Sequence, residues 1–173
     1  VAIYSPFLQR GYDNILHAIA LQNLPVHLMI DRAGLAVSDG ATHHGIFDVA
    51  FLSHIPNMTI YTPATYSALR VALNEALKSN SPTAVRYPRG SEPELPEDYE
   101  PSYGTYDLYG HMWADTVIVT YGRLFSEAAK AANILLKKGK KVKILKLNRI
   151  KPIDMDAVDA VIDSKHILFY EEG

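Results

Sequence analysis

The 173-residue chain contains no cysteine, carries almost no net charge and has no long apolar run. Without cysteine, neither disulfide bonds nor thiolate chemistry are available. The formal net charge is -2, and the longest basic block is Lys137-Lys138-Gly139-Lys140-Lys141, so the composition gives no indication of nucleic-acid binding. No apolar run approaches the roughly 20 residues that a transmembrane helix needs. We therefore expect no nucleic-acid partner, no membrane partner and a cytoplasmic location.

What the chain does have is an ordinary globular composition, with 48% hydrophobic and 21% charged residues. Its length suits one domain or two small ones with a real core. Val1 lies inside a predicted strand rather than at an initiator methionine, and Gly173 follows closely on another predicted strand. We interpret the sequence as a fragment of a longer protein.

Short apolar runs alternate with longer amphipathic ones, which is typical of β-α units on a mostly parallel sheet. In the first half we expect strands over residues 1–4, 26–30, 58–61 and 83–87. Helices are expected over 9–22 and 46–53, and a third begins near Thr65, a candidate N-cap, and ends near residues 79–80.

Between residues 91 and 110 prolines, an acidic run and four tyrosines break this alternation, as in a linker. Beyond it we expect strands over 116–121, 142–147 and 166–170, with helices over 126–138 and 154–162. The sequence therefore predicts an α/β protein with two doubly wound, mostly parallel sheets, both truncated. The first domain would span residues 1–92, the linker 93–112 and the second domain 113–173.

The richest polar segment is the loop from Asp31 to Gly45, directly after a predicted buried strand. Loops at the carboxyl ends of strands are where open α/β sheets place their chemistry. Arg32 suits bidentate recognition of phosphate or carboxylate. Asp39 and His43, four residues apart across a glycine, can converge on one ligand hydroxyl, with the imidazole moving a proton near neutral pH.

The plainer alternatives for this loop remain open. Asp31 is more readily explained by a local pair or a helix cap. His43 and His44 form a pair of a kind that is more often structural than functional. We expect no metal site, because adjacent side chains rarely point at one ion and no third ligand stands at a suitable spacing.

A second polar segment, Arg86-Tyr87-Pro88-Arg89-Gly90, follows the fourth predicted strand. Arg89, held between a proline and a glycine beyond the strand end, is expected at the same sheet edge as Arg32. Two arginines at that edge would make a phosphate clamp. Arg86 is expected to be a solvated side chain.

A third segment is the strand-to-helix turn from Tyr4 to Arg10, where free backbone N–H groups favour anions. Arg10 lies early in the predicted helix, where a cation is unfavourable unless an anion is near. Phe7 is either a core residue or an aromatic that stacks on a planar ring. The spacing leaves these two alternatives open.

Taken in order, the segments Tyr4–Asp13, Ile30–Gly34, Asp39–Gly45, Ile55–Met58 and Ala84–Gly90 resemble the 1-deoxy-D-xylulose-5-phosphate synthase family of the transketolase superfamily. The Asp-Gly-x-Thr-His element is shared with transketolases, whereas Asp-Arg-Ala-Gly and Arg-Tyr-Pro-Arg-Gly favour the synthases. Beyond the linker, Tyr121-Gly122 and Ile150–Asp154 resemble the superfamily's C-terminal domain. The resemblance implies a pyrimidine-binding domain followed by that C-terminal domain.

The resemblance also implies an activity. The family decarboxylates pyruvate on thiamine diphosphate and joins the two-carbon unit to glyceraldehyde 3-phosphate, for isoprenoid, thiamine and pyridoxal biosynthesis. By position, Phe7 would pack on the aminopyrimidine ring of the cofactor. His43 and Asp39 would be the catalytic pair, with His43 hydrogen-bonding the reacting oxygens. The acceptor substrate would be lined by Tyr4, Arg10, Arg32, Asp39 and Arg89.

The chain also departs from the family. Pro6 and His44 stand where the family more often has a small polar residue and a glutamine. The cofactor-activating glutamate, the magnesium ligands and the diphosphate-binding domain are expected outside these 173 residues. We therefore expect half an active site, inactive alone and completed in a homodimer. The alternatives are a transketolase-like half enzyme made as a separate subunit, and a non-catalytic pyrimidine-domain interaction module.

Overall fold

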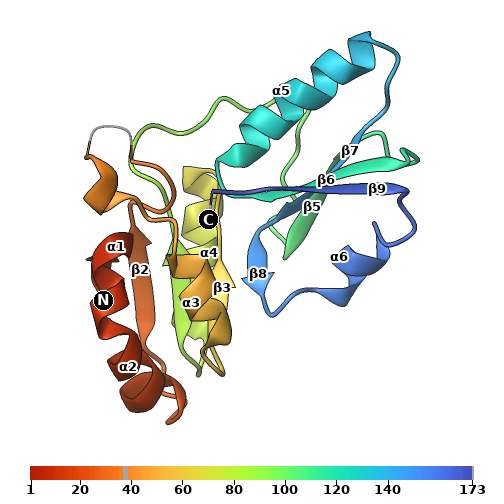
Figure 1. The fold of residues 1–173 in the computed structure, drawn as a ribbon. Helices are drawn as coiled ribbons and strands as arrows, with labels where there is room; N and C mark the ends of the chain where they lie inside the picture. Colours follow the sequence, from red (N-terminus) through yellow and green to blue (C-terminus); the bar gives the residue numbers. More distant parts are fainter. Residues whose placement is uncertain (37–38, 173) are drawn as a thin grey trace.

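A computed structural model describes residues 1–36 and 39–172, which form two mixed, mostly parallel sheets with helices packed on them (Figure 1). The expected α/β class with two sheets is confirmed. The first sheet has the order β1-β2-β4-β3-β8. Its parallel strands are β1 (Ala2–Tyr4), β2 (His27–Asp31), β4 (Thr83–Arg86) and β3 (Thr59–Tyr61), and the antiparallel edge strand is β8 (Arg149–Lys151).

Helical segments connect the successive parallel strands of the first sheet. After β1 the chain is helical without a break through α1 (Ser5–Leu8), η1 (Gln9–Gly11), α2 (Tyr12–Asn14) and η2 (Ile15–Ala20). The helix begins four residues earlier than the sequence predicts, because Pro6 suits a first helical turn. The other helices are η3 (Ala41–His43), α3 (Asp48–His54) and α4 (Tyr66–Lys78). The Oγ1 of Thr65 accepts from the backbone N of Ala68 at 3.1 Å, which confirms the predicted cap of α4.

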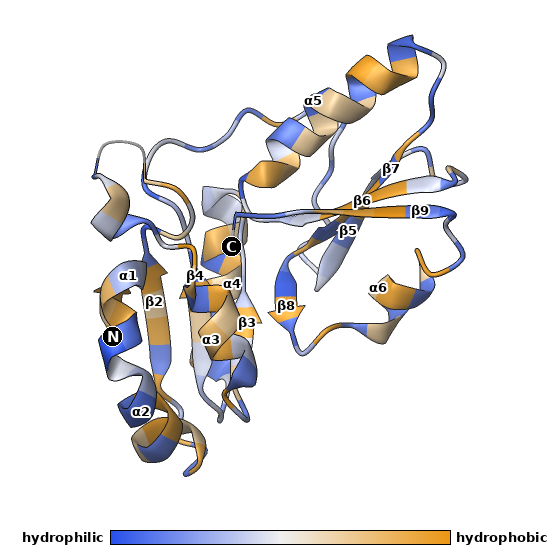
Figure 2. Cartoon of the chain, in the orientation of Figure 1, coloured by the Kyte–Doolittle hydropathy of each residue, from blue (hydrophilic) through white to orange (hydrophobic). Residues whose placement is uncertain are grey.

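The second sheet has the order β5-β7-β6-β9. It consists of β5 (Tyr106–Gly110), β7 (Lys143–Leu147), β6 (Thr116–Tyr121) and β9 (His166–Tyr170), with β5 antiparallel to β7 and the other pairs parallel. Its helices are α5 (Leu124–Lys137) and α6 (Met155–Asp159). Figure 2 shows apolar residues concentrated on strands such as β2 and β6.

The sequence does not predict β5 or β8. The segment that forms β5 lies within the expected linker, and its buried Asp107 hides the usual apolar alternation. The three residues of β8 become a strand only through pairing with Ile60 and Tyr61, about ninety residues earlier. Ile150 of β8 packs against the apolar cores of both halves. The second half is therefore joined to the first sheet by a strand as well as by side chains.

In the ranges that the structure covers, no helix has the length and apolar character needed to cross a membrane. The strand register decides where the polar loop lies. Tyr4 is opposite Asp31, and Ile30 is opposite Arg86, so β1, β2 and β4 end at one edge of the first sheet. The three polar segments of the sequence all leave from this edge.

Candidate functional site

Asp39 lies between two arginines at the carboxyl edge of the first sheet. Its Oδ1 is 2.5 Å from Nη1 of Arg89, and its Oδ2 contacts Nη1 of Arg32 directly. The side chains of Asp39 and Arg32 are 12% and 17% exposed, whereas that of Arg89 is 52% exposed. The structure thus brings together the two arginines that the sequence places at one edge, and their guanidinium groups share one carboxylate.

Arg32 adopts an unusual conformation. Its φ of 59° lies in the left-handed region, where a non-glycine residue stores about 1–3 kcal/mol of strain. The guanidinium donates from Nη2 to the hydroxyl of Tyr4 at 3.1 Å and lies 4.2 Å from the Tyr4 ring centroid. Asp31 supports the strained backbone, since its Oδ1 accepts from the N of Arg32 at 2.7 Å. This local bond agrees with the plainer explanation of Asp31.

Two polar atoms beside this cluster are buried without a hydrogen-bond partner among the residues described, namely Nε of Arg32 and Oγ of Ser5. A buried polar group without a partner costs about 1–3 kcal/mol. Such groups are rare in native structures, and each calls for an explanation such as a water, an ion or a functional role. The unpaired donor of Arg32 is what a site for an anion would leave.

Phe7 belongs to an aromatic cluster at the same edge. The rings of Tyr4 and Phe7 are stacked with centroids 5.7 Å apart, and the imidazole of His43 meets Phe7 edge-on at 5.4 Å. Arg10 joins the cluster with its Cζ 5.7 Å from the Phe7 centroid. Phe7 is 37% exposed and stands apart from the buried core. The core alternative for Phe7 is therefore wrong, and its ring is accessible to a ligand.

The two adjacent histidines have different environments. Nδ1 of His43 is 2.9 Å from Oγ1 of Thr42, and its ring contacts the aromatic cluster. In contrast, Nδ1 of His44 accepts from the backbone N of Ala36 at 3.0 Å. His44 therefore supports the backbone of the loop, whereas the ring of His43 contacts the aromatic cluster.

A pair of glycines closes the base of the polar loop. Gly34 and Gly45 exchange two backbone hydrogen bonds of 2.8 Å each. A Cβ at Gly45 would lie 2.2 Å from the carbonyl oxygen of Arg32 and 2.6 Å from Oγ of Ser5. Only glycine fits there. Gly45, which in the sequence is simply the end of the loop, therefore determines how closely the loop approaches α1. Residues 37–38 of this loop lie outside the described residues.

Arg86 is not the solvated side chain that the sequence predicts. Only 6% of its side chain is exposed, and Nε and Nη2 donate to the two carboxylate oxygens of Asp48 at 2.9 and 3.1 Å. Its guanidinium lies 5.5 Å from the ring of Tyr121, from the second half. Strand alternation turns Arg86 to the face that these residues cover. The prediction was wrong because nothing local in the sequence identifies Asp48 as its partner.

A second group of charges, which the sequence does not predict, is buried between the neighbouring strands β5 and β7 of the second sheet. Asp107 and Lys146 are each 3% exposed, with Nζ 3.0 Å from Oδ2. Tyr99, Ser102 and Asn148 donate to the same carboxylate at 2.5–2.9 Å. Burial alone would raise the pKa of Asp107, but the charge of Lys146 and the hydrogen bonds hold it well below its usual range. Every member is paired, so this network is structural.

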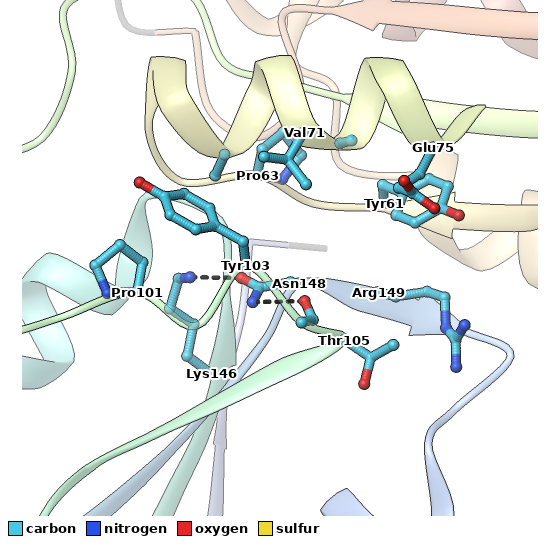
Figure 3. Close-up of a pocket in the computed structure, with 13 residues that line it drawn as sticks. Tyr61, Pro63, Val71, Glu75, Pro101, Tyr103, Thr105, Lys146, Asn148 and Arg149 are labelled. Atoms are coloured by element: carbon cyan, nitrogen blue, oxygen red, sulfur yellow. Dashed lines mark hydrogen bonds between the residues drawn. The ribbon is translucent and has the colours of Figure 1, made fainter. Parts of the chain in front are cut away.

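A cavity of about 280 Å³ lies next to this network, between α4 and the chain around Tyr103 (Figure 3). Lys146 and Asn148 line it but bond to each other, and Asn148 also donates to the carbonyl of Gly104 at 3.0 Å. The cavity shares no lining residue with the edge where Asp39 lies. The candidate site is therefore the edge and not this cavity.

Comparisons with known proteins identify two matching family models along the chain. The model of the transketolase pyrimidine-binding domain matches residues 1–93, and that of the transketolase C-terminal domain matches residues 112–173. A 1-deoxy-D-xylulose-5-phosphate synthase of Clostridium botulinum is 44% identical over 155 residues, covering 88% of this chain and 25% of the relative. The synthase of Clostridium tetani is 39% identical over 174 residues, covering 99% and 28%. The chain thus spans about a quarter of the length of these curated relatives.

Solved structures show the same fold. An inactive tetramer of a split-gene transketolase superimposes with a TM-score of 0.81 at 22% identity, covering 98% of this chain and 56% of that chain. A transketolase variant from Pichia stipitis gives a TM-score of 0.82 at 21% identity, covering 97% and 26%. The expected resemblance is confirmed in both sequence and fold.

Proposed function

We propose that this chain forms the pyrimidine-binding and acceptor-binding side of a 1-deoxy-D-xylulose-5-phosphate synthase. The chain belongs to the transketolase family through its pyrimidine-binding and C-terminal domains. The observation that supports this most is the pair of arginines, Arg32 and Arg89, gathered on Asp39 beside the ring of Phe7. The substrates proposed are pyruvate and glyceraldehyde 3-phosphate.

The arginines suit the phosphate of the acceptor. Arg32 keeps a buried Nε that finds no acceptor in residues 1–36 and 39–172, and a phosphate oxygen can supply one. Arg89 is half exposed, so its guanidinium can move from the Asp39 carboxylate to an entering phosphate. Arg10, held against Phe7, adds positive charge at the same edge. Asp39 would then exchange part of its ion pairing with Arg89 for hydrogen bonds from the acceptor's hydroxyls.

His43 and Asp39 are the proposed catalytic pair. Thr42 engages Nδ1 of His43, so we assign Nε2 to the reacting oxygens of the substrate. There the imidazole can stabilise developing negative charge and move a proton. Tyr4 stacks on Phe7 and bonds Arg32, so it links the phosphate end of the pocket to its reacting end.

The aromatic cluster fits the cofactor proposed for the family. Phe7 offers a partly exposed ring held by Tyr4 and by the edge of His43, which suits an aminopyrimidine. When bound, thiamine diphosphate supplies the carbanion stabilisation that a decarboxylating carbon–carbon ligation needs. We assign the magnesium ligands, the diphosphate contacts and the cofactor-activating glutamate to protein outside these residues, within a homodimer. We likewise propose a bacterial cytoplasmic location and a role in isoprenoid precursor synthesis.

The test compares the two substrates in the complete enzyme that contains these residues. Arg89→Ala should raise KM for glyceraldehyde 3-phosphate about tenfold or more, since a charge-assisted hydrogen bond contributes about 1.5–3 kcal/mol, while KM for pyruvate changes little. Arg70→Ala, which removes an exposed arginine of α4, is the matched control and should change neither. Equal effects of Arg89→Ala on both substrates would contradict the phosphate role.

The second candidate is a half enzyme that works with a separate diphosphate-binding subunit, and the fold shared with a split-gene transketolase favours it. The 173-residue chain alone, with thiamine diphosphate and magnesium, should form no product. Activity restored by a separately made N-terminal portion of a synthase would support the half enzyme. Robust activity of the chain alone would show that our assignment of the missing half is wrong.

A further inference from the structure

Two side chains of the second half form hydrogen bonds to the backbone of the polar loop. Leu35 donates from N to Oε2 of Glu172 at 2.8 Å, and its carbonyl oxygen accepts from Nη2 of Arg123 at 2.9 Å. The partners are 137 and 88 positions further along the chain. Both polar groups of a single loop residue are therefore bound by the other domain. We call Arg123 and Glu172 the clasp.

The clasp is itself rigidly built. Nε and Nη2 of Arg123 donate to the two carboxylate oxygens of Glu172 at 2.9 and 3.2 Å, a bidentate pair that fixes the orientation of both groups. The Glu172 side chain is only 12% exposed. The chain just before it is tied to β6, because the hydroxyl of Tyr121 donates to Glu171 at 2.9 Å and Thr120 donates to the carbonyl of Tyr170 at 2.8 Å.

The loop is shaped to receive the clasp. A Cβ at Gly34 would lie 1.9 Å from Oε2 of Glu172, and the φ of Gly34 is +82°. A glycine here is needed both for the backbone conformation and for the approach of the carboxylate. The contact is thus a fitted one and not a chance meeting of surface charges.

The clasp lies next to the residues that support the site. Leu35 precedes Ala36, whose N donates to Nδ1 of His44 at 3.0 Å and whose O accepts from the N of Asp39 at 3.2 Å. A displacement of Leu35 would therefore displace the backbone of Asp39 and the hydrogen bond between Ala36 and His44, next to His43.

We propose that Arg123 and Glu172 are positioning residues through which the C-terminal domain holds the acceptor-binding loop, residues 33–36 and 39–45, in its working conformation. The kinetic part of this inference rests on the proposed function. The two domains then form the site together: the first supplies the groups that touch the acceptor, and the second fixes the backbone that carries them.

The experiment measures amide hydrogen exchange and steady-state kinetics on the complete enzyme. Glu172→Ala should speed exchange in the described part of the loop about tenfold, leave exchange in β6 and β7 unchanged, and raise KM for glyceraldehyde 3-phosphate more than KM for pyruvate. Asp115→Ala is the matched control, because the exposed carboxylate of Asp115 pairs with Lys165 of the same domain, and it should leave loop exchange at the wild-type rate.

Three further variants separate positioning from simple domain stability. Glu172→Gln keeps an acceptor for Leu35 N and should recover much of the loop's protection. Arg123→Lys loses the bidentate contact with Glu172 and should speed loop exchange in the same way as Glu172→Ala, but less. The double variant R123E/E172R restores an ion pair but reverses the donor and acceptor that Leu35 needs, so it should not recover protection. Recovery in that double variant would mean that only the ion pair matters, and would overturn the proposal.

Wild-type loop exchange in Glu172→Ala would also overturn it, whatever the activity. Faster loop exchange without a change in KM for the acceptor would contradict the positioning role. Because exchange is read without substrate, a complete enzyme lacking synthase activity would refute the proposed function while leaving the exchange result to decide whether the clasp holds the loop.

Discussion

The molecule contains two groups of charged side chains that differ in how completely they are paired. Around Asp107 and Lys146 both charged groups are buried, and the carboxylate receives hydrogen bonds from three further side chains. Around Asp39 one arginine is half exposed, and a second keeps a buried Nε without a partner among the described residues. A closed network stabilises a fold, whereas an open one at strand ends leaves donors for a ligand.

The same contrast separates two arginines only three residues apart. Arg86 pairs with a buried carboxylate inside the protein, whereas Arg89 is half exposed at the sheet edge, where we propose that a ligand replaces its partner. Residue type alone does not distinguish these two arginines. Their burial and the location of the carboxylate that each one binds distinguish them.

The largest expected difference is in stability. Arg86→Met leaves the carboxylate of Asp48 buried and uncompensated, so we expect a loss of about 3–5 kcal/mol in the free energy of unfolding. Arg89→Met removes a half-exposed ion pair and should cost less than about 1 kcal/mol. Urea denaturation of both variants measures this. Similar losses of unfolding free energy in the two variants would contradict the difference between Arg86 and Arg89.

A smaller contrast is expected between two serines. Ser102→Ala removes a 2.5 Å hydrogen bond to the buried Asp107 carboxylate and should cost about 1.5–3 kcal/mol. Ser5→Ala removes a buried oxygen that has no hydrogen-bond partner in the described parts of the chain, so stability should stay unchanged or rise slightly. Thermal unfolding of the two variants decides this. A clear loss in Ser5→Ala would indicate that Ser5 belongs to a closed network after all.

The smallest effect is a pH dependence of the closed network. Because the folded pKa of Asp107 is lowered, its stabilisation is present above the unfolded pKa of about 3.9 and is lost as pH falls toward the folded value. The stability difference between wild type and Asp107→Asn should therefore be constant from about pH 5 to 8 and about 1 kcal/mol smaller at pH 3. Asp98→Asn, at an exposed carboxylate bonded to Tyr109, is the control. A difference that does not change with pH would contradict the role given to Asp107.

The sequence predicts the candidate site better than it predicts the supports of that site. Arg32 and Arg89 are predictable because each follows a parallel strand, and parallel strands end at a common edge. The Asp48 partner of Arg86, the strand β8 and the clasp at Leu35 depend on chain segments 38 to 137 positions away. No local pattern encodes such pairings. For Phe7, the spacing leaves core packing and ligand contact open, and the structure shows only that the ring lies outside the core.

The most direct test of the central claim, that the open charge group at the sheet edge binds the acceptor's phosphate, uses Arg32→Met in the complete enzyme. The measurement compares kcat/KM for glyceraldehyde 3-phosphate with kcat/KM for unphosphorylated glyceraldehyde. We predict that the variant loses about ten- to a hundredfold with the phosphorylated acceptor and little with the other, because the lost charge-assisted bonds are to phosphate. Equal losses with both acceptors would contradict the claim.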